Sequence, residues 1–244
     1  MADDLLAPDG RVVMVSGASR GIGAAIARRL HDDGFALSLG ARRPETALAA
    51  LGPYDDSRVI AAHFDALQQG AAAAWLARTL ERFGRLDGLV NNAGILRQVT
   101  FDNDDEGALD QMWAVNVKAP LRLIRLALPE LRRTGTGRIV NIASTDGKRY
   151  RDASVSIGYA MTKHALVALS HAARFAGWEH GVRVTALCPS AVETDLLDGI
   201  PGAVPSGQRM APETVANAVS FLLRLPNAAS AAELTLNARL ESTL

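Results

Sequence analysis

The chain has 244 residues, of which 48% are hydrophobic and 21% are charged, and its 26 basic side chains balance its 26 acidic ones. This composition excludes a disordered chain, and the sequence has no apolar run of 18 residues that would predict a membrane span. Without a basic excess, nucleic acids and membranes are not expected as partners. The single cysteine, Cys188, excludes an intramolecular disulfide and a zinc site built from cysteines.

Two further features of the composition guide the interpretation. The first ten residues, MADDLLAPDG, are acidic and lack the apolar centre of a signal peptide, so the expected compartment is the cytoplasm. Among the basic residues only Lys118, Lys148 and Lys163 are lysines. In a chain that otherwise uses arginine, each lysine is a candidate for a specific role.

In chain order, short apolar runs alternate with stretches of helical periodicity. Strands are predicted at residues 11–16, 35–40, 58–63, 86–91, 137–143, 182–187 and 233–237. Helices are predicted at residues 21–33, 68–83, 106–117, 119–133, 158–180 and 212–225, with Lys118 between the two central ones. Residues 189–210 are rich in proline, glycine and serine and are predicted to form a loop or lid.

This alternation predicts an α/β fold. We expect a single Rossmann-type domain over residues 1–244, with a doubly wound parallel β-sheet of about seven strands and helices on both faces. No change of composition marks a domain boundary, and no internal repeat is present.

Residues 16–23 read SGASRGIG and lie where the first strand becomes the first helix. Glycines at 17, 21 and 23 permit a tight turn and the close approach of a pyrophosphate, which the helix N-terminus would bind. Residues 17–21 also match G-x-S-x-G, the nucleophile elbow of α/β-hydrolases. That alternative fails because only one strand precedes the turn and no histidine follows His180. By itself, the turn also fits a glycine-rich loop that binds nothing.

Tyr159 and Lys163 form a Y-x-x-x-K pattern on a predicted helix, so that the phenol and the ammonium project from one face. A free phenol titrates near pH 10, and a nearby cation favours its ionised form. Lowering its pKa to about 7 would need roughly 4 kcal/mol. The alternative is a solvated helix face, against which the rarity of lysine argues.

Five motifs in this order resemble the short-chain dehydrogenase/reductase family over about residues 10–225. They are the glycine turn, NNAG at Asn91–Gly94, Asn116 in VNV, Ser144 after GRIVNIA, and Tyr159 with Lys163. The resemblance, which is to the 3-oxoacyl reductases in particular, implies an NAD(P)-dependent oxidoreductase that moves a hydride between nicotinamide and an alcohol or carbonyl substrate.

The resemblance also implies a role for each catalytic candidate. Tyr159 would act as general acid or base, and Ser144 would stabilise the developing charge on the substrate oxygen. Lys163 would hold the nicotinamide ribose and lower the pKa of Tyr159, while Asn116 would support a proton-relay water.

The end of the second predicted strand bears on the cofactor. An NAD enzyme usually has an acid there, whereas this chain has Ala41 followed by Arg42 and Arg43, with Arg20 within reach of the same corner. NADP(H) is therefore favoured, and NAD(H) stays open as the alternative. The arginines also fit a solvated surface pair.

By resemblance, the cofactor-binding residues are Gly17, Ser19, Arg20, Gly21, Ile22, Gly23, Ala41, Arg42, Arg43, Asp65, Ala66, Asn92, Ala93, Gly94, Tyr159, Lys163, Pro189, Val192 and Thr194.

Some segments depart from the family pattern. Pro189 is followed by serine where the family commonly has glycine. Residues 145–158 form a longer segment than usual, and its Lys148, Arg149 and Arg151 lead to the hypothesis of an anionic substrate, with a solvated loop as the alternative. The C-terminus lacks the diglycine ending of tetrameric 3-oxoacyl reductases, so a homodimer is expected ahead of a homotetramer.

Two other functions stay open at this point: a non-catalytic dinucleotide-binding regulator, and an epimerase-type reaction on the same fold. A regulator would not need Ser144 and Tyr159 together. None of the five histidines has metal-ligand spacing, so no metal is expected. The expected partner is a small alcohol or carbonyl compound.

Overall fold

The computed structural model describes residues 5–103 and 105–240. Seven strands form one sheet in the order β3-β2-β1-β4-β5-β6-β7, and every pair is parallel. The strands are β1 (Val12–Ser16), β2 (Ala36–Ala41), β3 (Val59–His63), β4 (Gly88–Asn91), β5 (Arg138–Ile142), β6 (Arg183–Pro189) and β7 (Glu233–Leu236). The predicted parallel sheet of about seven strands is therefore confirmed.

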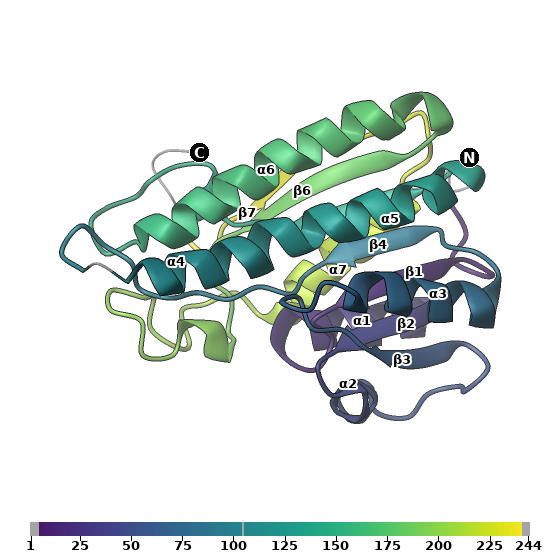
Figure 1. Cartoon of the computed structure of the whole chain (residues 1–244), viewed down its shortest axis with the longest axis horizontal. Coiled ribbons are helices and arrows are strands. Elements are labelled where there is room, and N and C mark those ends of the chain that lie inside the picture. Colours follow the sequence, from purple (N-terminus) through teal and green to yellow (C-terminus); the bar gives the residue numbers. More distant parts are fainter. Residues whose placement is uncertain (1–4, 104, 241–244) are drawn as a thin grey trace.

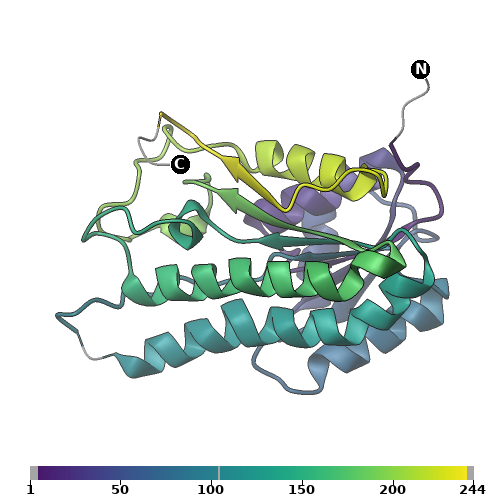
Figure 2. The ribbon, with the colours of Figure 1, turned by 90° about the horizontal axis from the view of Figure 1, so that it is seen from above.

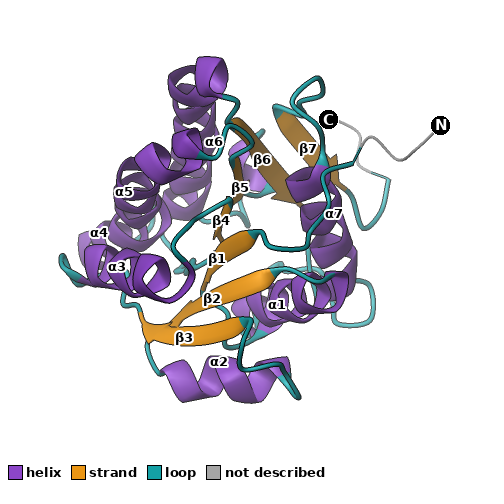
Figure 3. Cartoon of the chain, turned by 90° about the vertical axis from the view of Figure 1, so that its right-hand side faces the viewer, coloured by secondary structure: helices purple, strands orange, loops and turns teal. Residues whose placement is uncertain are grey.

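Helices cover both faces of the sheet, as predicted (Figure 1, Figure 3). One face carries α1 (Gly21–Asp33), α2 (Pro44–Leu51) and α7 (Pro212–Arg224). The other face carries α3 (Ala71–Phe83), α4 (Glu106–Trp113), α5 (Ala119–Arg133) and α6 (Ile157–Gly177). Figure 2 shows α6 running alongside the helical segment that α4 and α5 form together. Within the described ranges, no helix combines the length and apolarity that crossing a bilayer requires.

Two elements differ from the sequence-based prediction. Helix α2 lies outside every predicted element, because it is short and buries only Ala47 and Leu51, which leaves a weak periodic signal. The helices predicted on either side of Lys118 are in fact joined: a π-helical turn, Ala114–Lys118, connects α4 to α5 without a break. The other predicted boundaries shift by a few residues, as is usual at helix and strand ends.

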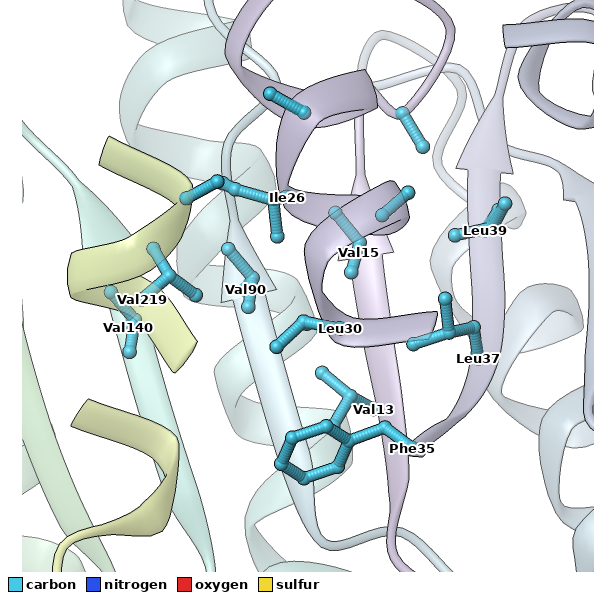
Figure 4. Packing of buried hydrophobic residues seen from close by; sticks show 14 of the residues in the cluster. Val13, Val15, Ile26, Leu30, Phe35, Leu37, Leu39, Val90, Val140 and Val219 are labelled. Atoms are coloured by element: carbon cyan, nitrogen blue, oxygen red, sulfur yellow. The ribbon is translucent and has the colours of Figure 1, made fainter. Parts of the chain in front are cut away.

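Branched aliphatic side chains fill the space between the sheet and helices α1 and α7. Figure 4 shows Val13, Val15, Leu37, Leu39 and Val90 of the strands against Ile26, Leu30 and Val219 of the helices. Strands covered on both faces are apolar throughout rather than alternating, which explains why the predicted strands are continuous hydrophobic runs. This packing fixes the first turn of α1 directly after the end of β1.

The order of the strands reverses between β1 and β4, and the chain is tied together at this point. The Ser16 hydroxyl accepts hydrogen bonds from the backbone N–H groups of Asn92 (3.0 Å) and Ala93 (3.1 Å). The Asn92 side chain donates in return to the carbonyls of Ser16 (3.0 Å) and Gly17 (3.1 Å). Ligands of doubly wound folds bind where the order reverses, outside the carboxyl ends of the strands.

Gly40 of β2 offers a test of the packing. A Cβ at this position would lie 2.6 Å from the ring of Trp75, which is fully buried and donates to the Ser38 hydroxyl (2.8 Å). We expect Gly40→Val to lower the free energy of unfolding by about 1–3 kcal/mol in urea denaturation, because neither the ring nor the strand has room to move. Gly70→Ala is the control, since its Cβ meets no atom within 4 Å. Equal stability of the Gly40→Val variant and the wild type would contradict this account.

Candidate active site

A cavity of about 690 Å³ opens at the carboxyl ends of the strands. Its walls come from residues that follow or end β1, β2, β4, β5 and β6, so it sits at the reversal point of the sheet. The volume is within the range of small-molecule and cofactor sites.

The glycine turn forms one end of the cavity, and its shape requires glycine. Gly17 has a φ of +67°, and a Cβ on it would lie 2.9 Å from the Cα of Ala93. A Cβ on Gly23 would lie 2.1 Å from the carbonyl oxygen of Gly17. The N-cap residue Arg20 makes no side-chain capping bond, so the first N–H groups of α1 have no such acceptor. This cradle fits a pyrophosphate, which would accept from those groups.

Asn116 lies inside the π-helical turn and is 1% exposed. Its side-chain oxygen accepts from the backbone N–H of Ile95 (2.9 Å), and its side-chain nitrogen donates to the carbonyl of Ile95 (2.9 Å) and to the hydroxyl of Thr162 (3.1 Å). These bonds connect the segment after β4 to helix α6. Asn116 does not itself line the cavity.

Ser144 follows β5 and lies against α6. Its hydroxyl accepts from the backbone N–H of Asp146 (3.1 Å) and caps the short 3-10 turn Thr145–Gly147. The turn can approach α6 because residue 147 is glycine: a Cβ there would lie 2.8 Å from the backbone of Lys163. Ser144 is 8% exposed and lines the cavity.

Helix α6 presents Tyr159 and Lys163 on one face. Its N-cap residue, Ser156, accepts from the backbone N–H of Tyr159 (3.3 Å) and donates to the carbonyl of Arg97 (2.7 Å), which fixes where the helix starts. The Lys163 Nζ lies 5.4 Å from the centre of the Tyr159 ring and donates to the carbonyl of Ile142 (2.8 Å). Both side chains line the cavity and are less than 10% exposed.

The pKa of Tyr159 shifts in the direction opposite to the sequence-based expectation. Burial raises the pKa of the phenol, the negative charge of Asp146 raises it further, and a hydrogen bond with Ser144 only partly opposes them. Burial also lowers the pKa of Lys163 to about 8, against the opposing effects of Cys188 and Asp146. The Lys163 ammonium donates to a backbone carbonyl rather than to the phenol, so the expected lowering does not occur in this geometry.

Most of the residues assigned to the cofactor lie on the cavity wall. They are Gly17, Arg20, Gly21, Ile22, Ala41, Arg42, Asp65, Ala66, Asn92, Ala93, Gly94, Tyr159, Lys163, Pro189, Val192 and Thr194. Ser19, Gly23 and Arg43 do not line it. For Gly23 the reason is its tight packing against Gly17, which supports the turn from behind.

The lid predicted over residues 189–210 reaches across the cavity to the glycine turn. Val192 forms an isolated parallel bridge with Met210, which closes the base of the loop. Arg20 forms a 2.6 Å ion pair with Asp195, although both side chains are about two-thirds exposed, so the pair contributes little stability. Arg20 is therefore engaged with the lid, whereas the sequence suggested that it reaches the 2′-phosphate corner.

The basic cluster at residues 148–151 does not line the cavity as a unit. Lys148 pairs with Glu233 of β7, which also pairs with His171 (2.7 Å). Only Arg151 of the three basic residues is on the wall, and it pairs with Asp152 (2.8 Å). The hypothesis of an anionic substrate therefore loses most of its support.

Several wall residues were not singled out from the sequence: Leu96, Arg97, Gln98, Asp146, Leu196, Leu197, Ala238 and Arg239. Asp146 could have been found, because it follows Ser144 by two residues, whereas the others belong to no motif. Over residues 5–103 and 105–240, no three His, Cys, Asp or Glu side chains gather closely enough to hold a metal ion.

Comparison with known families gives the same result as the geometry. The family model of the short chain dehydrogenases matches residues 11–202. The chain belongs to the short-chain dehydrogenase/reductase family. The predicted family and fold class are thereby confirmed.

Curated relatives and solved structures place the chain within this family. Two agropine synthesis reductases of Rhizobium rhizogenes are each 41% identical over 219 residues, which is 89% of this chain and 50% of each relative. The chain thus spans about half the length of these relatives. Levodione reductase of Leifsonia aquatica is 31% identical over 195 residues, covering 77% of this chain and 72% of the relative.

Two solved structures show the same fold with dinucleotides bound. The 3-ketoacyl-(acyl-carrier-protein) reductase from Brucella melitensis, complexed with NADH, matches with a TM-score of 0.86 and 27% identity over 94% of this chain and 98% of that one. The alcohol dehydrogenase from the archaeon Thermococcus sibiricus, complexed with 5-hydroxy-NADP, matches with a TM-score of 0.83 and 32% identity over 95% and 99%.

The burial of Lys163 has a measurable consequence for stability. Because its pKa is lowered to about 8 in the folded chain but is about 10.4 when unfolded, the folded state releases a proton that the unfolded state keeps between these values. Stability of the wild type should therefore rise with pH across this window, relative to Lys163→Met. Thermal melting of both proteins at pH 7 and pH 10 would measure this change. Each kcal/mol in the free energy of unfolding should shift the melting temperature by about 2–4 °C.

The exposed Lys118 provides the control. We expect Lys118→Met to melt in parallel with the wild type over the same pH range. If the melting temperature of Lys163→Met, relative to that of the wild type, were lower at pH 7 than at pH 10, the burial penalty on the ammonium would have the wrong sign.

Proposed function

We propose that this protein is an NADP(H)-dependent oxidoreductase that transfers a hydride between nicotinamide and an alcohol or carbonyl substrate. The observation that supports it most directly is that one continuous cavity joins the glycine turn to Ser144, Tyr159 and Lys163. A dinucleotide held by the glycine turn would extend along this cavity toward the three polar side chains. We further propose that residues 1–244 work as one domain with the lid over residues 189–210.

The side chains of the wall suit proton transfer to a carbonyl oxygen. The raised pKa of Tyr159 keeps its phenol protonated at neutral pH, so the hydroxyl can donate the proton during reduction. The Ser144 hydroxyl would stabilise the charge that develops on the same oxygen. The bound nicotinamide would supply or accept the hydride.

Lys163 and Asn116 have supporting roles in this proposal. Lys163 lies on the same helix face as Tyr159 and would bind the nicotinamide ribose hydroxyls. Asn116 is a positioning residue, because its amide is occupied by Ile95 and Thr162 and holds the segment after β4 against α6.

The end of β2 favours NADP(H) over NAD(H). Ala41 ends the strand, and the exposed Arg42 follows it on the cavity wall with no carboxylate at the position where NAD enzymes usually carry one. A guanidinium at this corner suits a 2′-phosphate. Both cofactor types occur among the similar structures, which hold NADH and an NADP analogue.

A homodimer is part of the proposal. Helices α5 and α6 lie side by side and expose apolar side chains, namely Leu121, Leu126 and Met161. A second copy of the chain would remove these side chains from water.

Replacing Tyr159 by phenylalanine tests the mechanism. We expect Tyr159→Phe to keep its affinity for NADPH within about twofold and to lose about 10²–10⁴-fold in kcat, since the phenol acts as acid and base. A panel of carbonyl compounds and alcohols, followed by the absorbance of NADPH, measures this loss. Tyr150→Phe is the matched control, because Tyr150 is half-exposed and off the cavity wall. Full turnover by Tyr159→Phe would end the proposed mechanism.

Replacing Arg42 tests the choice of cofactor. We expect Arg42→Ala to weaken NADPH binding by about tenfold or more and to change NADH binding by less than about threefold, because only the 2′-phosphate needs the guanidinium. Fluorescence titration of both cofactors measures this. Arg43→Ala, which alters a neighbour off the cavity wall, should have the smaller effect. Equal losses for the two cofactors would contradict NADP(H) preference at this corner.

A further inference from the structure

The cavity wall beside Tyr159 carries an acidic side chain, Asp146. It lies in the 3-10 turn Thr145–Gly147, two residues after Ser144, and this turn is held against the backbone of Lys163. Asp146 is partly buried and lines the cavity. It therefore belongs to the end of the cavity that contains the proposed catalytic side chains rather than to the glycine turn.

Asp146 differs from the other acidic residues of the wall in having no partner. The others are satisfied: Asp65 accepts from the backbone N–H of Leu67 (2.9 Å), Asp195 pairs with Arg20 (2.6 Å), and Asp198 pairs with Arg209 (3.5 Å). Among the residues that the structure describes, none donates a hydrogen bond to the Asp146 carboxylate or forms an ion pair with it. A carboxylate partly withdrawn from water without a partner is unfavourable, so a ligand that supplied one would be stabilised.

The charge of this carboxylate acts on the groups proposed to react. Burial raises the pKa of Asp146, and the positive charges of Arg151 and Arg149 oppose the shift. Its negative charge in turn raises the pKa of both Tyr159 and Lys163. A positive group bound between Asp146 and Tyr159 would thus meet a carboxylate that no described residue binds directly, with Lys163 as the cation of the same wall.

We propose that Asp146 selects substrates that carry a protonated amine within a few bonds of the carbon that is oxidised or reduced. The inference rests on the proposed function, because Tyr159 defines where the reacting carbon lies. An ammonium group would donate to the carboxylate and neutralise it, whereas a hydroxyl would donate but leave the charge in place.

A cationic substrate is the opposite of the anionic one expected from Lys148, Arg149 and Arg151. Lys148 is paired with Glu233, and Arg151 with Asp152, so neither offers an unpaired cation to the cavity. Of the other arginines of the wall, Arg42 lies at the proposed 2′-phosphate corner, and Arg97 and Arg239 are exposed and keep their hydration. Lys163 is the buried cation beside Tyr159 and donates to the carbonyl of Ile142, whereas the carboxylate of Asp146 would repel a substrate carboxylate at its own position.

Two alcohols of nearly equal size provide the test. 1-Amino-2-propanol is protonated at neutral pH and 1,2-propanediol is neutral, so they differ mainly in charge beside the reacting carbon. With NADP⁺ as acceptor, we expect the wild type to favour the amino alcohol in kcat/KM by about tenfold or more. Asp146→Asn keeps the shape of the side chain and should lower this preference by about tenfold, because kcat/KM falls more for the amino alcohol than for the diol.

A control variant is Asp110→Asn, since Asp110 is exposed and off the cavity wall. It should keep the preference of the wild type. Asp146→Ala is a second variant in case the asparagine disturbs the turn, with thermal melting as the check on folding. An equal loss on both alcohols in Asp146→Asn would mean that Asp146 acts only through Tyr159 or Lys163, and it would overturn the proposal. So would an unchanged preference, or a wild type that favours the diol.

A binding measurement separates this inference from the function on which it rests. Calorimetric titration of 1-amino-2-propanol into the protein with NADP⁺ does not require turnover. If the wild type oxidises neither alcohol and reduces no carbonyl compound, the proposed function fails. Binding that is at least about tenfold weaker in Asp146→Asn would still support a site for amines, and equal binding in the two proteins would refute it.

Discussion

The site depends on the hydrogen bonds that join the two chain segments leaving β1 and β4. The Ser16 hydroxyl and the Asn92 amide hold these segments together at the point where the strand order reverses. Gly17 must lack a side chain because the backbone of Ala93 lies where a Cβ would be. The floor of the cavity is therefore a product of the sheet topology, and the remaining groups are arranged around it.

Three further groups are positioned from the second half of the chain, each by a local device. Asn116 uses a π-helical turn to reach the backbone of Ile95, Ser144 uses a glycine three residues later to approach α6, and the N-cap Ser156 sets the start of that helix. These devices are short-range, but together they bring the segment after β4, the turn after β5 and helix α6 to one end of the cavity. Such preorganisation is what proton transfer and charge stabilisation require.

The sequence predicted the fold well because buried parallel strands are continuous apolar runs, and a helix such as α1 has an unambiguous periodicity. Helix α2 was not predicted because it buries only two side chains. The motif residues lie largely where the pattern placed them, since backbone turns determine their positions. Asp146, Arg97 and Arg239 belong to no motif, and their approach to one cavity depends on tertiary packing. The direction of the Tyr159 pKa was also beyond the sequence, because burial dominates over helical spacing.

The π-helical turn at Ala114–Lys118 also affects how this protein tolerates changes in length. The turn accommodates one residue more than a regular helix, so it behaves as an insertion that the fold has absorbed. Deleting a single residue from it would restore regular winding and leave α4 and α5 with the faces they already bury, because the extra residue is held within the widened turn. The loss would fall on Asn116, which lies inside this turn and reaches Ile95 and Thr162 from it. The widened turn therefore serves the position of one amide rather than the path of the two helices.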